Sequence, residues 1–100
     1  MQDEDEKLVE QANDALNALE RRYWQSDSEA DKAMLRPQIE MAMSAWLQAR
    51  IQLLKAGTMA TEDDLNLIAQ IKREIDDARD TQETIVAAAR LIMAIGRFVV

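Results

Sequence analysis

The chain has 100 residues and a formal net charge of −7, and it contains no cysteine and no histidine. These absences exclude a disulfide scaffold and a thiolate metal site, and they remove the most common general base and transition-metal ligand. The acidic balance argues against nucleic-acid binding, because contacts to phosphate need cationic side chains. With two glycines, one proline and 48% hydrophobic residues, the composition predicts one all-α domain spanning residues 1–100.

The sequence shows no targeting signal. The first ten residues are acidic and lack the basic region that begins a secretory signal. No run of 18 uncharged apolar residues occurs, so a membrane-spanning helix is not expected. We therefore expect a cytoplasmic protein.

The first predicted helix covers residues 5–25. Its apolar residues recur at steps of three and four, the spacing of one buried helix face, and they include Leu8, Ala12, Ala15 and Leu19. The acidic cluster from Asp3 to Glu6 favours the helix dipole at this end. We expect this cluster to be a frayed and solvated terminus rather than a metal site.

The second predicted helix covers residues 27–56 and begins at the capping-box pattern from Ser26 to Glu29. Pro37 lacks a backbone N–H and crowds the preceding turn, so we expect a kink near it or a restart of the helix there. Gly57 is expected to end the helix with a left-handed backbone. The predicted buried stripe consists of Leu35, Ile39, Ala42, Trp46, Ala49, Leu53 and Ala56.

The third predicted helix covers residues 61–99, begins at the cap Thr61 and shows no obvious break. A heptad seam runs along it for more than four repeats, from Ile68 to Val99, with Gln82 as its one polar member. Beyond Thr84 a second apolar row joins the seam, so the helix is expected to be buried on nearly all sides near its end.

The lengths of these three helices do not match. At 1.5 Å per residue they would be roughly 32, 45 and 58 Å long. If the helices are antiparallel neighbours, the third one passes the start of the second near Leu91 and leaves the last ten residues uncovered. Exposing so much apolar surface would cost several kcal/mol, so we expect an elongated three-helix bundle that forms an oligomer, with a coiled-coil-like contact, through its long C-terminal helix.

The candidate interaction residues follow from this uncovered tail. Trp24 closes the first helix, and we expect it at the same end of the bundle as the tail, where it either covers Phe98 or contacts a partner. The predicted contact set is Trp24, Leu91, Ile92, Ile95, Phe98 and Val99.

Two alternatives stay open. Glu74 and Asp77 form an E-x-x-D pattern on one helix, which resembles half of the Mg²⁺ site of all-α nucleotide pyrophosphatases. The usual paired E-x-x-E motif is missing, and a solvated charged face is the preferred explanation of these carboxylates. The apolar stretch 84–100, with Arg90 and Arg97 on one stripe, could instead bind a membrane surface, although an acidic protein is repelled by anionic lipid.

The function that the sequence favours is contact rather than catalysis. No serine has a histidine partner, no glycine-rich loop could hold phosphate, and no cofactor is expected. We expect a helical interaction module such as an adaptor, a chaperone, an inhibitor or immunity-type protein, or a phage or bacterial assembly component. Its expected partners are other copies of the chain and a protein with a basic or apolar surface.

Overall fold

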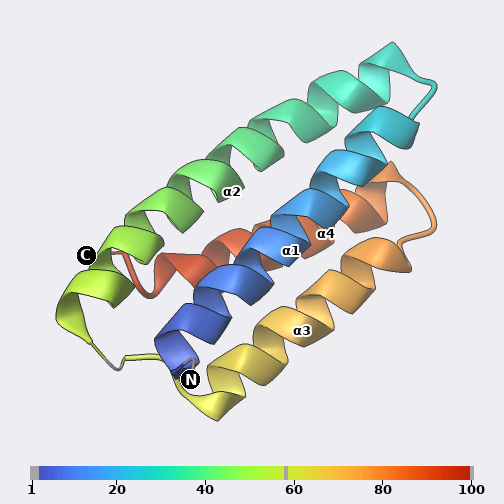
Figure 1. Ribbon diagram of the computed structural model, residues 1–100. Helices are drawn as coiled ribbons and strands as arrows, with labels where there is room; N and C mark the ends of the chain where they lie inside the picture. The colour runs from blue at the N-terminus through green and yellow to red at the C-terminus, as the bar shows by residue number, and fades with distance from the viewer. Residues whose placement is uncertain (1–2, 58, 100) are drawn as a thin grey trace.

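The computed structural model describes residues 3–57 and 59–99, which form four helices and no strands. The helices are α1 (Glu4–Gln25), α2 (Glu29–Ala56), α3 (Glu62–Asp76) and α4 (Thr81–Gly96). They lie side by side along one long axis (Figure 1). The all-α prediction is confirmed, whereas the predicted number of three helices is wrong.

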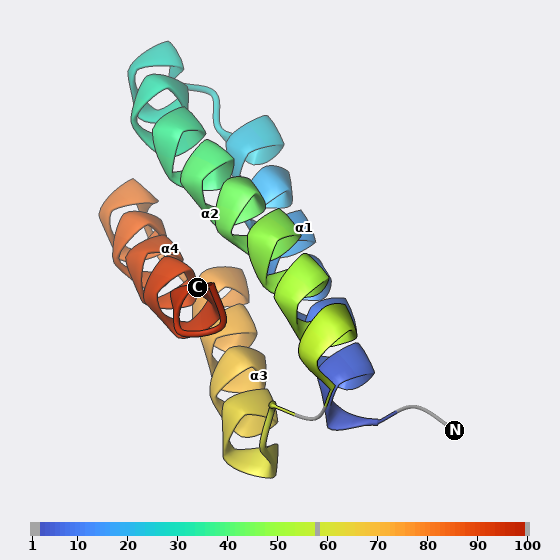
Figure 2. The same ribbon diagram turned by 90° about the vertical axis from the view of Figure 1, so that its left-hand side faces the viewer.

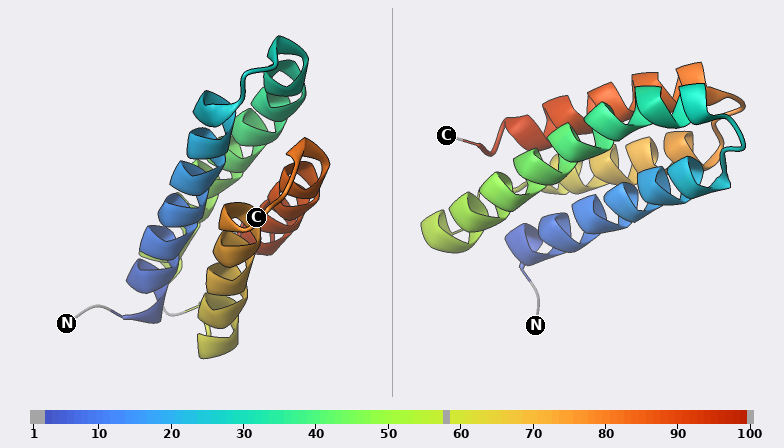
Figure 3. Two further views of the ribbon diagram at one scale, coloured as in Figure 1. Left: turned by 90° about the vertical axis from the view of Figure 1, so that its right-hand side faces the viewer. Right: turned by 90° about the horizontal axis from the view of Figure 1, so that it is seen from above.

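The bundle is made of two antiparallel hairpins, α1 with α2 and α3 with α4 (Figures 2 and 3). The helix α1 packs against α2 and α3, and α4 packs against α2 and α3, so α1 lies diagonally opposite α4. The connection from α2 to α3 therefore crosses the diagonal of the bundle, and α1 runs parallel to α3 (Figure 1). The whole bundle measures 42 × 22 × 19 Å.

The predicted uninterrupted helix 61–99 is divided by a turn between Asp76 and Thr81. Asp80 caps the new helix by accepting a hydrogen bond from the backbone N–H of Glu83 at 2.8 Å. Glu83 in turn accepts one from the N–H of Arg79 at 3.1 Å. The apolar period gave no sign of this break, because both helices bury their apolar faces in the same core.

An arginine from α1 closes the end of α3. The Nε of Arg22 donates to the carbonyl oxygen of Ile75 at 3.0 Å, and its Nη2 donates to those of Asp76 at 2.8 Å and Ala78. The last carbonyl groups of a helix have no partner inside the helix, so the guanidinium supplies the donors that they need. Arg22 thereby connects the first hairpin to the turn of the second.

The start of α1 is an ordered structural site rather than a frayed end. Asp3 caps α1 by accepting from the N–H of Glu6 at 2.9 Å. Asp5 is only 2% exposed, and its Oδ1 accepts from the N–H groups of Met59 at 2.9 Å and Ala60 at 2.7 Å. The prediction of a solvated terminus is therefore wrong at Asp5, which holds the connection between α2 and α3.

We expect Asp5→Ala to lower the free energy of unfolding by about 2–3 kcal/mol, because the buried amide of Ala60 and the partly buried amide of Met59 would lose their carboxylate acceptor. Urea denaturation followed by circular dichroism measures this change. Glu6→Gln, an exposed neighbour in the same turn, is the matched control and should change the stability by less than about 0.5 kcal/mol. Equal effects of the two substitutions would contradict a structural role for Asp5.

The helix α2 begins two residues later than predicted and is not divided at Pro37. Ser28, rather than Ser26, caps it by accepting from the N–H of Asp31 at 3.2 Å. Pro37 leaves the carbonyl of Ala33 without its helical partner, but both residues are exposed and water can satisfy that group. Gly57 ends the helix with a φ of 85°, as predicted.

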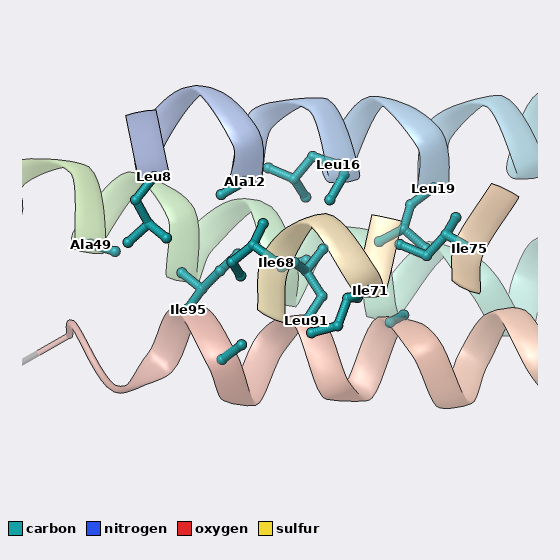
Figure 4. Packing of buried hydrophobic residues seen from close by; sticks show 14 of the residues in the cluster. Leu8, Ala12, Leu16, Leu19, Ala49, Ile68, Ile71, Ile75, Leu91 and Ile95 are labelled. Atoms are coloured by element: carbon teal, nitrogen blue, oxygen red, sulfur yellow. The ribbon is translucent and has the colours of Figure 1, made fainter. Parts of the chain in front are cut away.

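The core fills the space between the two hairpins (Figure 4). Leucines of α1 and isoleucines of α3 meet there, and α4 adds Leu91 and Ile95. Trp46 packs against this core as predicted, and its indole N–H donates to the carbonyl of Val9 at 2.9 Å. The apolar side chains of Leu91, Ile95 and Phe98 are thus buried in the chain's own core.

Candidate functional site

The tail that was predicted to be uncovered lies inside the molecule. Leu91, Ile95 and Phe98 are buried in the core, and Ile92 and Val99 are half-buried against it. The reason is the turn at residues 77–80, which folds α4 back along α3 and removes the overhang. In this fold, the three buried side chains have no surface to offer to a partner.

Polar contacts hold the end of α4 against the start of α3. Asp64 is buried, and its Oδ2 accepts from the N–H of Thr61 at 2.9 Å and from the Thr61 hydroxyl at 3.1 Å. Its Oδ1 accepts from Arg97, and the guanidinium of Arg97 lies 5.2 Å from the centre of the Phe98 ring. Arg97, whose side chain is 58% exposed, therefore links the end of α4 to the start of α3 at the surface of the bundle.

Trp24 is exposed but lies far from the tail. It is 73% exposed at the end of α1, whereas Phe98 lines a small cavity with Leu8 and Leu53 at the other end of the bundle. The expected contact set is thus not brought together. Whether Trp24 contacts a partner stays a prediction.

The surroundings of Trp24 are aromatic and cationic. The rings of Trp24 and Tyr23 meet edge to face at 5.0 Å, and the ammonium of Lys32 lies 5.9 Å from the Trp24 ring. Arg36 donates to the Tyr23 hydroxyl, and this hydrogen bond raises the pKa of Arg36 above its ordinary value. These contacts orient the aromatic pair at the end of α1.

One of the two carboxylates of the magnesium hypothesis, that of Glu74, is engaged in an ion pair within the chain. Glu74 forms an ion pair with Arg90 of α4, and both Glu74 and Asp77 line an open groove between α3 and α4. Nearby, a hydrogen bond from Lys72 lowers the pKa of Asp76. Within residues 3–57 and 59–99, no group of three carboxylates is arranged to hold a metal ion.

In the same part of the chain, no helix has the length and apolar character needed to cross a membrane.

The largest exposed apolar feature is on α2. Six of the ten large hydrophobic side chains that are exposed in the described part of the chain belong to this helix. Four of them recur at steps of four, four and three and so share one face. We call this set the α2 outer row, which consists of Met43 (40% exposed), Leu47 (47%), Ile51 (63%) and Leu54 (58%).

The α2 outer row points away from the bundle. The opposite face of α2 carries the buried residues Leu35, Ala42, Ala49 and Leu53, which pack toward α1 and α4. Figure 1 shows α2 along one edge of the bundle, with no helix on its outer side. A soluble monomer rarely exposes such a continuous apolar face without a use for it.

Two charged residues mark the ends of the α2 outer row. Glu40 precedes Met43 by almost one turn, and Lys55 follows Leu54 directly. Both are exposed, and neither forms an ion pair within the residues that the structure describes. Arg36, one turn earlier on the same helix, lies close enough to Glu40 to interact with it electrostatically. The row is therefore apolar in its middle, with an acid at one end and a base at the other.

The sequence contained the signal for this surface. Met43, Leu47 and Ile51 are spaced by four residues, which is as regular as the spacing of the inner stripe. A helix with apolar residues on two faces is expected to be covered on both.

Comparison with family models, with characterised proteins and with solved structures finds no match to this chain. The argument for function therefore depends on the surface itself.

Proposed function

We propose that this protein is a non-enzymatic helical module that acts by protein–protein contact, and that the α2 outer row is its contact surface. The observation that carries the proposal is the exposed apolar face of α2, on a helix whose other face already supplies the core. Removing this row from water would favour association by about 25 cal/mol for each Å² of apolar surface buried. The proposal keeps the class of function expected from the sequence but moves the contact from the tail to α2.

The character of the row fits this role. Methionine, leucine and isoleucine side chains adapt to a facing helix, and methionine in particular fills irregular gaps. A helix with apolar residues at steps of three and four is a standard element for packing against another helix. The helices α1 and α3 each carry a net negative charge, which favours solubility rather than non-specific association.

A photo-cross-linking amino acid placed at position 47 or at position 86 tests the proposal in the cells that produce the protein. Val86 is the matched control, because it is an exposed apolar residue on the outer face of α4. We expect a discrete cross-linked protein product from position 47 and none from position 86. Absence of a product at position 47, or equal products at both positions, would overturn the assignment of α2 as the contact surface.

A further inference from the structure

We infer that the α2 outer row binds the same row of a second copy of the chain, with the two α2 helices antiparallel around a twofold axis at Leu47. This inference rests on the proposed function, since it names the partner of the same surface. A twofold contact requires a surface that is complementary to itself. Each contact between two different residues of the two copies then occurs twice. Three of the four residues of the α2 outer row meet this condition, and so do the two charged residues that flank the row.

Three of the four residues of the α2 outer row are symmetric about Leu47, and the fourth, Leu54, faces Glu40 of the second copy. Met43 lies four residues before Leu47 and Ile51 lies four residues after it, which is roughly 6 Å on either side. In the antiparallel pair, Leu47 meets Leu47 of the second copy, and Met43 meets Ile51 of the second copy. The side chains of the two rows can therefore interdigitate over the middle of α2.

The charged residues also match. Glu40 lies seven residues before Leu47 and Lys55 lies eight residues after it, which is about 10 Å and 12 Å along the helix. The twofold axis therefore brings Glu40 beside Lys55 of the second copy, and it does so twice. A parallel pair in register would place Glu40 beside Glu40 and Lys55 beside Lys55, which is unfavourable.

The net charges of the helices also favour contact through α2. The helix α2 contains three acidic and four basic residues, whereas α1 contains six acidic and three basic residues and α3 contains five acidic and two basic residues. Two copies of a chain with a net charge of −7 repel each other overall. Contact through α2 keeps the acidic helices α1 and α3 apart and joins the copies at a helix whose four basic and three acidic residues give it a net charge of +1.

Sedimentation equilibrium on the purified full chain at low salt tests the inference. We expect a dimer, and we expect Glu40→Lys and Lys55→Glu each to raise its dissociation constant roughly tenfold, because two attractive pairs become repulsive. An equimolar mixture of the two variants should regain the affinity of the original chain, since each mixed pair then joins opposite charges. Failure of the mixture to recover would overturn the antiparallel twofold arrangement.

Leu47→Glu tests the apolar centre of the contact. We expect it to give a monomer with an unchanged helical spectrum, because Leu47 is half exposed in the single chain, while Val86→Glu should remain a dimer. A wild-type monomer at 100 µM (roughly the range of weak specific contacts) would overturn self-pairing. If position 47 still cross-links to a different protein in cells, the proposed function stands without self-pairing, and if it cross-links to nothing, both fail.

Discussion

Leu91→Ala should lower the free energy of unfolding by about 3–4 kcal/mol. Leu91 is fully buried between the two hairpins, so its truncation removes apolar contacts and leaves a cavity that a packed core fills only in part. Such a loss is a large fraction of the total stability of a domain of this size. Urea denaturation monitored by circular dichroism measures the difference.

Met93→Ala is the control for this prediction. Met93 lies on the same helix only two residues away, but it is 77% exposed. Its truncation should change the stability by less than about 0.5 kcal/mol. Leu91→Ala could instead leave the stability of the monomer unchanged and reduce the molecular mass in solution. That outcome would contradict the burial of the tail in its own core, because Leu91 would then be buried by a partner.

Arg22→Ala is the second substitution with a large expected effect, a loss of about 2–3 kcal/mol. In the original chain, the guanidinium of Arg22 donates to the carbonyl groups of Ile75, Asp76 and Ala78. Hydrogen bonds from a charged donor are among the stronger ones in proteins. Arg22→Lys should restore less than half of the loss, because a single ammonium cannot reach three carbonyls with the geometry of the planar fork. Thermal and urea denaturation both report the change.

Arg21 provides the comparison for Arg22. It is the neighbouring residue with the same side chain, but it is exposed and forms only a surface ion pair with Asp76 at 3.6 Å. Arg21→Ala should therefore cost less than about 1 kcal/mol. If the two alanine variants were equally stable, the closure of α3 by Arg22 would not contribute to the fold.

The local features of the fold could be predicted from the sequence. The stripe of α1, the cap at Thr61, the end of α2 at Gly57 and the inward position of Trp46 follow from spacing and from capping chemistry. Each of these depends on residues that are neighbours in the chain or on one face of one helix. Such signals do not require knowledge of what the helix packs against.

The division of the last helix could not be predicted from periodicity. The apolar pattern continues through residues 77–80, because α3 and α4 supply two walls of one core. Asp80 and Glu83 carry a capping signal for the start of α4. The end of α3, however, also needs hydrogen-bond donors for its last carbonyl groups, and Arg22 supplies them from more than 50 residues earlier in the chain. The burial of Asp5 is non-local in the same way, since its partners are in the connection at residues 59 and 60.

The candidate surface was missed for a different reason. The row at Met43, Leu47 and Ile51 has the same regular spacing as the inner stripe of α2, so spacing alone does not show which residues lie outside the core. An uninterrupted third helix would place the exposed apolar surface at its overhanging end instead. The turn at residues 77–80 removes that overhang, and the exposed apolar surface is then concentrated on α2.

The helix α1 is fastened to α3 at both ends, and this determines how the two helices are aligned. Asp5 and Arg22 are 17 residues apart, or roughly 25 Å along α1, and they bind the two ends of the α3 segment at residues 59–60 and 75–78. Apolar stripes repeat every turn, so hydrophobic packing alone would tolerate a shift of one helix by about 5.4 Å. Such a shift would separate both polar anchors at once, so these two residues select one alignment among several that bury similar apolar surface.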